Sequence, residues 1–137
     1  MMAKLTYLPA QPIGDGVYRL QLGRLEVFEL ETGMVAGGRL RQIGVTPKPI
    51  HLIMSSIMSG RIEDGAGGTV GNPFASVASE SDILNVVHLG LVGGGMDRDD
   101  AWAIVSKFGP PNRPLSEMHD IAAALVYAHI VGVDNEA

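Results

Sequence analysis

Residues 79–95 read SESDILNVVHLGLVGGG, and this stretch decides the fold that we expect. Ser79 is a good helix N-cap, and Asp82 completes the capping pattern, in which the two side chains satisfy free backbone amides at a helix start. Apolar or small residues then recur at helical spacing, which is typical of a helix with one inward face. They are Ile83, Val86, Val87, Gly90 and Leu91. The glycines at 93–95 end the pattern, so the stretch predicts a core helix over residues 79–92.

Two more helices should follow this one. Asp97 and Asp100 repeat the capping arrangement, and the sequence GPPN at 109–112 is a firm break. Pro114 opens a last helix that should run to about Val131 and span roughly 27 Å at about 1.5 Å per residue. The inward residues of the two helices are Ala101, Ile104, Val105, Phe108, Met118, Ile121, Ala122, Leu125 and Val126, with Trp102 beside the first stripe. We expect the last helix to organise the core.

The first 22 residues alternate in the manner of strands. Gly14-Asp15-Gly16 marks a turn because glycine and aspartate tolerate positive φ. Pro9 and Pro12 limit where the first strand can pair. The sequence therefore predicts a β-hairpin over residues 1–22 whose first arm is irregular.

The first helices should lie within residues 24–60. The stretch 24–32 places Leu25, Phe28 and Glu29 at helical spacing before Gly33, a natural helix stop. A second helix is expected to begin at Thr46 as N-cap and to end at Gly60. Its apolar stripe comprises Ile50, Ile53, Met54, Ile57 and Met58.

Residues 61–78 are rich in glycine, so they either form a mobile loop or become ordered against a partner, and we favour the mobile loop. No repeat and no second domain is visible. The expected fold is a single α+β domain over residues 1–137, predominantly α. It would consist of the hairpin (1–22), the first helices (24–60), the flexible loop (61–78) and the C-terminal helices (79–131), with about five helices in all.

Composition restricts the function. The chain has 10 Lys and Arg against 15 Asp and Glu, a net charge of −5, so it lacks the basic stripe of a nucleic-acid-binding protein. It has no cysteine, which fits a reducing compartment. No apolar run approaches the ~20 residues that a membrane helix needs, and the first residues do not resemble a signal peptide. We expect a cytoplasmic protein that binds neither nucleic acid nor membrane.

The usual motifs of catalysis and metal binding are absent from the sequence. His51, His88, His119 and His129 include no pair at i, i+4 for a zinc site, and we interpret each as surface or half-buried. The acidic run at 97–100 lacks the later ligands of an EF-hand, and the glycine stretches lack the Gly-Lys-Ser/Thr of a phosphate loop. No Gly-x-Ser-x-Gly elbow occurs.

Carboxylates offer no better candidate. Glu26 and Glu29 should be solvated beside Arg24, and no pair of acids is placed for acid–base catalysis. The sequence therefore predicts no catalytic residue, no metal site and no cofactor, and thus a protein that is not an enzyme.

Four pieces of the chain, in order, carry a family resemblance. The first, GDGVYRLQL at 14–22, runs into GRLE at 23–26, and Glu29 and Gly33 close the short helix. The second is DILNVVHLGL at 82–91, which is followed by Gly94-Gly95. The third is the acidic helix start at 97–100, and the fourth is the last helix from Pro114-Leu115. The chain resembles the small tail proteins of gene transfer agents and siphophage-like prophages, which are grouped with the phage tail assembly chaperones. The likeness covers most of the chain except residues 1–10 and 61–78.

The resemblance implies a role in tail assembly. Such chaperones bind the tape-measure protein, keep its apolar helices soluble, help tail-tube subunits to polymerise around it, and commonly form homo-oligomers. Methionine and tryptophan side chains could supply an adaptable binding surface. The candidate partner-binding residues are Met54, Met58, Met96, Trp102 and Met118, and Met34 is a further methionine of this kind. Two alternatives stay open: a structural tail component, such as a tube or connector subunit, and a small ligand-binding or enzymatic domain.

Overall fold

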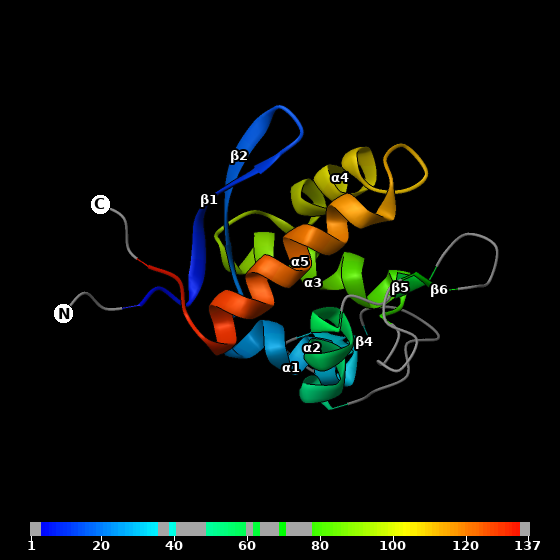
Figure 1. The fold of residues 1–137 in the computed structure, drawn as a ribbon. Coiled ribbons are helices and arrows are strands. Elements are labelled where there is room, and N and C mark those ends of the chain that lie inside the picture. The colour runs from blue at the N-terminus through cyan, green and yellow to red at the C-terminus, as the bar shows by residue number, and fades with distance from the viewer. Residues whose placement is uncertain are drawn as a thin grey trace.

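A computed structural model describes residues 4–35, 39–40, 49–59, 62–63, 69–70 and 78–134. It confirms the predicted fold class, because a two-stranded antiparallel hairpin is followed by five helices (Figure 1). Two long helices cross the centre, the hairpin lies on one side, and the first and last described segments lie side by side. An isolated antiparallel bridge between Leu5 and Val133 joins these segments.

The hairpin consists of β1 (Tyr7–Ile13) and β2 (Gly16–Gln21). Its register shifts between Leu8 and Gln11, so the first arm is irregular as predicted. Gly14 opens the turn with a φ of 62°, a backbone conformation that glycine adopts without strain.

Helix α1 (Arg24–Thr32) has the predicted bounds, and Gly33 ends it in the left-handed conformation with a φ of 73°. Its orientation differs from the expectation. Leu25 and Phe28 are 63% and 47% exposed, whereas Glu29 is buried. The prediction that Glu29 is solvated was therefore wrong, because a cation from a distant helix meets it inside the fold.

Helix α2 (Ile50–Met58) begins later than predicted. Pro49 is its N-cap with extended backbone, and the expected cap at Thr46 lies outside the described residues. A proline disfavours helical backbone in the residue before it, so a helix that runs through Pro49 was a poor expectation. The helix ends at Met58 with Ser59 as its cap, and Gly60 lies outside the described residues.

Two short strand pairs were not predicted. They are β3 (Met34–Val35) with β4 (Arg39–Leu40), and β5 (Ile62–Glu63) with β6 (Thr69–Val70), both antiparallel. The second pair lies within the stretch that we interpreted as a loop. The rest of that stretch, up to residue 77, lies outside the described residues, and its mobility stays a prediction.

The C-terminal helices are α3 (Glu80–Gly93), α4 (Arg98–Phe108) and α5 (Leu115–Ile130). The Ser79 hydroxyl accepts a bond from the Asp82 amide at 3.1 Å, as the capping pattern predicts. The Asp97 carboxylate caps α4, but it accepts from the Asp99 amide at 3.0 Å, one residue earlier than expected.

The core lies where α3 and α5 meet the inner side of the hairpin, and the predicted apolar stripes of both helices are buried. His88 on α3 is also buried, so its interpretation as surface or half-buried was wrong. Gly93 and Gly94 pack on the backbone of β2, where a Cβ would overlap the carbonyl oxygens of Gln21 and Arg19. The glycines that end α3 thus also let the hairpin lie directly against it.

Candidate functional site

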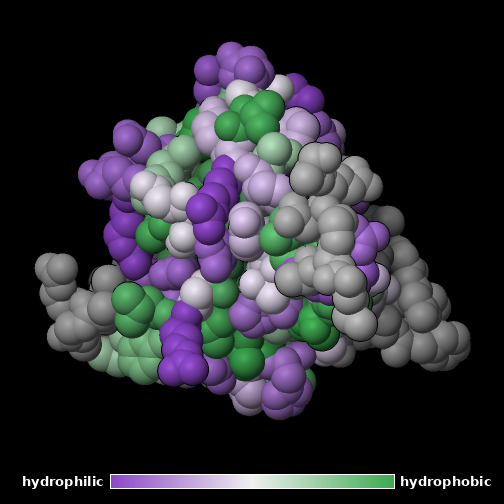
Figure 2. Space-filling model, turned by 90° about the vertical axis from the view of Figure 1, so that its left-hand side faces the viewer, coloured by the Kyte–Doolittle hydropathy of each residue, from purple (hydrophilic) through white to green (hydrophobic). Residues whose placement is uncertain are grey.

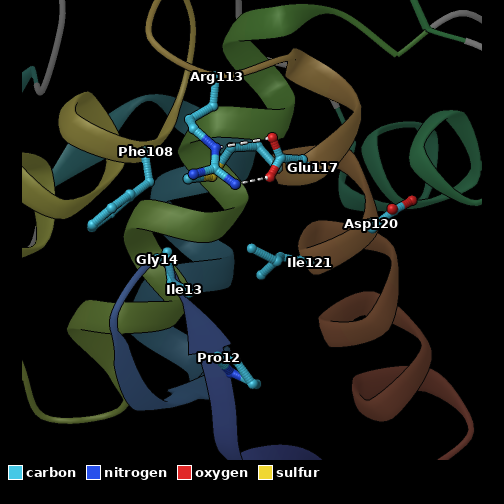
Figure 3. Close-up of a pocket in the computed structure, with 9 residues that line it drawn as sticks. Pro12, Ile13, Gly14, Phe108, Arg113, Glu117, Asp120 and Ile121 are labelled. Atoms are coloured by element: carbon cyan, nitrogen blue, oxygen red, sulfur yellow. Dashed lines mark hydrogen bonds and ion pairs between the residues drawn. The ribbon is translucent and has the colours of Figure 1, made fainter.

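A cleft of about 230 Å³ opens where the hairpin turn faces the junction of α4 and α5 (Figure 3). Gly14 belongs to the turn and Phe108 to the last turn of α4. The Phe108 ring lies so close to the turn that a Cβ on Gly14 would overlap it. Position 14 therefore requires glycine for two reasons: the backbone has a positive φ, and the close contact with the Phe108 ring, which forms one wall of the cleft, leaves no room for a Cβ.

The floor of the cleft is apolar and belongs to the core. Ile13, Met118 and Ile121 are 2%, 1% and 9% exposed. Met118 and Ile121 are three residues apart on α5, so they share one face of the helix. Figure 3 shows the Ile121 side chain directed into the space between the hairpin turn and α5.

The rim of the cleft is polar. Arg113 donates two parallel hydrogen bonds to the Glu117 carboxylate, from Nε to Oε2 at 3.1 Å and from Nη2 to Oε1 at 2.6 Å (Figure 3). This hydrogen bonding lowers the pKa of Glu117 and raises that of Arg113. Asp120 is the third charged residue of the rim and points away from the ion pair.

The charge of the rim and the volume of the cleft limit the kind of group that it can hold. Because the hydrogen bond from Arg113 lowers the pKa of Glu117, that carboxyl is ionised at neutral pH and already engaged by the guanidinium. The volume of the cleft is also below the ~300–1,000 Å³ of most small-molecule and cofactor sites. A space of this size with an apolar floor suits one side chain of a protein partner.

The candidate partner-binding residues do not form one surface in the structure. Met54 and Met118 are 7% and 1% exposed and belong to the core. Met58 and Trp102 are each 44% exposed, at the end of α2 and on α4, and Met96 is half-buried before α4. Of this set, Met118 alone lines the cleft. The prediction that these residues bind a partner stays a prediction.

A polar cluster that the sequence did not reveal joins α1, α3 and α4. Arg98 pairs with the buried carboxylate of Glu29. His88 Nε2 lies 3.2 Å from the Arg98 carbonyl oxygen, and the His88 ring meets Trp102 edge-on at 4.7 Å. Trp102 thus contacts a buried histidine although the residue is 44% exposed.

Several of the exposed apolar side chains are neighbours on α1 or at the end of α5. Leu25 and Phe28 lie three residues apart on α1, while Tyr127, Ile130 and Val131 form a stripe at the end of α5. On the side of the molecule that carries the chain ends, hydrophobic residues are most continuous in the lower half, with hydrophilic ones between them (Figure 2). Surfaces of this kind are typical of contact with other proteins.

Two further kinds of site are absent from the part of the chain that the structure describes. None of its helices combines the length and apolar character needed to cross a bilayer. Nor do its His, Asp and Glu side chains form a group of three or more that could hold a metal ion.

The chain matches no model of a known protein family, no curated protein and no solved structure. The resemblance to tail assembly proteins therefore stays a prediction from the sequence.

Proposed function

We propose that this chain is a protein-binding domain without catalytic activity, and that it acts in tail assembly as a chaperone of the tape-measure protein. The observation that carries the proposal is the cleft between the hairpin turn and α5. It offers a buried apolar floor of Ile13, Met118 and Ile121 under a charged rim, in a volume of about 230 Å³. Interfaces concentrate their binding energy where one anchor side chain fills such a pocket.

The charged rim favours a reversible partner over a permanent one. The bidentate pair of Arg113 and Glu117 is half in solvent, with side chains 50% and 43% exposed. Transient interfaces combine an apolar centre with a polar rim, and the polar groups of the rim are solvated by water when the partner dissociates. A chaperone that releases the tape-measure protein needs a site of this type.

The tail-assembly part of the proposal rests on the sequence pieces at 14–26 and 82–100 and on the acidic composition. A net charge of −5 limits nonspecific adsorption to DNA, which is present in quantity while particles assemble. The same resemblance supports tail-tube subunits as secondary partners and a homo-oligomeric state in the cytoplasm.

Co-expression with a tape-measure protein tests the proposal. We expect the tape-measure protein to stay in the supernatant and to co-purify with this chain. An unrelated acidic helical domain of similar size is the control for nonspecific solubilisation. A tape-measure protein that is equally insoluble with and without this chain would rule out the chaperone role.

A structural tail subunit is the second candidate, and the exposed stripe at the end of α5 favours it. Tyr127, Ile130 and Val131 are 45%, 59% and 55% exposed. Such a stripe suits a permanent subunit contact, because obligate interfaces are more hydrophobic than transient ones. Mass spectrometry of purified particles separates the two candidates. A chaperone should be missing from finished particles, whereas a tube or connector subunit should be abundant in them.

A further inference from the structure

The charges around the cleft are unequal at its two ends. Arg113 and Glu117 neutralise each other through two hydrogen bonds. Lys107 lies over the Phe108 ring, 5.2 Å from its centroid, at the wall formed by α4. At the α5 end stands Asp120, for which no hydrogen bond or ion pair with another described residue is present. Figure 3 shows its carboxylate on the outer side of α5, directed away from Ile121, so the outer edge of the rim carries a carboxylate without a partner among the described residues.

The hairpin edge beside the cleft is a poor template for an added strand. Pro9 and Pro12 in β1 have no amide hydrogen to donate, and the register shift between Leu8 and Gln11 interrupts the ladder. On the other strand, the backbone of β2 at Arg19 and Gln21 lies against the glycines that end α3. A partner in extended conformation would find few backbone groups to pair with, whereas a helix satisfies its own.

From these two observations we infer the chemistry of the occupant. The cleft binds an amphipathic helix that inserts one apolar side chain over Ile13 and Ile121 and carries a lysine or arginine about one turn away, facing Asp120. The apolar anchor fits the buried floor, and the cation complements Asp120, the rim carboxylate with which no other described residue pairs. This inference rests on the proposed function, since it names the feature of the partner protein that the same cleft recognises.

Synthetic helices test this inference without the tape-measure protein. The probe is an alanine- and glutamine-based peptide of roughly 15 residues, a length at which isolated helices become stable, with one leucine and a lysine one turn later. Its matched control carries glutamate in place of the lysine. Binding to the full chain is followed by NMR titration of the backbone amides.

We expect the lysine peptide to shift the amides of Ile13, Gly14 and Ile121 and to bind about two- to fivefold more tightly than the glutamate peptide, the range for one exposed charge pair. The variant Asp120→Lys should reverse the preference. Asp120 is exposed, so this change leaves the core intact. The control Glu80→Lys adds the same charge at an exposed site on α3 away from the cleft and should keep the wild-type preference.

Three results would overturn the inference. The first is equal affinity of both peptides for the wild-type chain, and the second is an unchanged preference in Asp120→Lys. The third is a shift of the same amides with protein concentration alone, which would identify a second copy of this chain as the occupant. None of these results bears on whether the chain solubilises a tape-measure protein, so the two proposals can fail separately.

Discussion

Glu29 on α1 and Arg98 at the start of α4 form an ion pair between residues 69 positions apart in the sequence. The Glu29 side chain is 2% exposed and that of Arg98 is 39% exposed. Arg98 Nη1 donates to Glu29 Oε2 at 3.2 Å, and Nη2 donates to the other carboxylate oxygen. The hydrogen bond raises the pKa of Arg98. The pair fixes the rotation of α1, which leaves Leu25 and Phe28 on the outside.

Removing one partner of this pair should destabilise the fold. Arg98→Met takes the guanidinium away from a buried carboxylate, and we expect the free energy of unfolding to fall by about 2–3 kcal/mol. This is less than the ~3–5 kcal/mol of fully buried pairs because water already reaches part of Arg98. The double variant Glu29→Leu/Arg98→Met should recover most of the loss, since neither charge is then buried. Equal urea midpoints for the single and double variants would contradict the role of the pair.

Because α3 packs closely on β2, we expect Gly93→Ala to lower the free energy of unfolding, although helix propensity alone would raise it. Gly93→Ala would stabilise an isolated helix by about 1 kcal/mol. In the fold, the new Cβ would overlap the Gln21 carbonyl, so we expect a net loss of about 1–3 kcal/mol in urea unfolding. Ser106→Ala, at an exposed site on α4, is the control and should stabilise by about 0.5 kcal/mol. Stabilisation by both variants would show that the contact is absent.

Most of the helices could be predicted because their signals are local. Ser79, Asp97 and Pro114 each sit at the start of a helix that the structure contains, and Gly33 ends α1 as expected. The rotation of α1 could not be predicted, because it depends on Arg98 in a distant part of the chain. The cap signal at Thr46 predicts too early a start for α2, because Pro49 disfavours helical backbone in the residue before it and is itself the extended N-cap.

Two methionines of the candidate partner-binding set should respond differently to the same substitution. Met118→Ala removes a side chain that is 1% exposed, and we expect a loss of about 2–5 kcal/mol in the free energy of unfolding. Met58→Ala changes a side chain that is 44% exposed and should stay within about 0.5 kcal/mol of wild type. Chemical denaturation of both variants measures the difference. Similar midpoints would mean that Met118 does not lie in the core.

The ion pair at the cleft rim should be visible in a pH titration. Arg113 holds the pKa of Glu117 below its ordinary value of 4.5. Because the pKa of this carboxyl is lower in the folded than in the unfolded state, its ionised form stabilises the fold above pH 4.5. This contribution to the free energy of unfolding is lost as the pH falls through the lowered pKa. In Arg113→Gln the pKa of Glu117, followed by ¹³C NMR of its carboxyl, should rise towards 4.5.

Asp134 provides the control for this titration. Its pKa is lowered by Lys4 at the chain ends, through a hydrogen bond of 2.6 Å, and should not change in Arg113→Gln. Identical Glu117 curves in the two proteins would mean that the bidentate contact does not persist in solution.

The cleft itself could be anticipated only in part. The apolar stripe that holds Met118 and Ile121 was predicted from helical spacing. That the hairpin turn lies beside Phe108 follows from tertiary packing, for which a single sequence carries no local signal. Residue type alone does not distinguish Met58 at the surface from Met54 in the core, so the sequence could not select the methionines that are free to bind.

The most direct measurement is the amount of soluble tape-measure protein recovered with this chain and with its cleft variant. The wild-type chain and the Glu80→Lys control should raise the soluble fraction to the same level, and Asp120→Lys should raise it clearly less. No increase with the wild-type chain would contradict the account that this domain works by holding a tail protein in the cleft between its hairpin and α5.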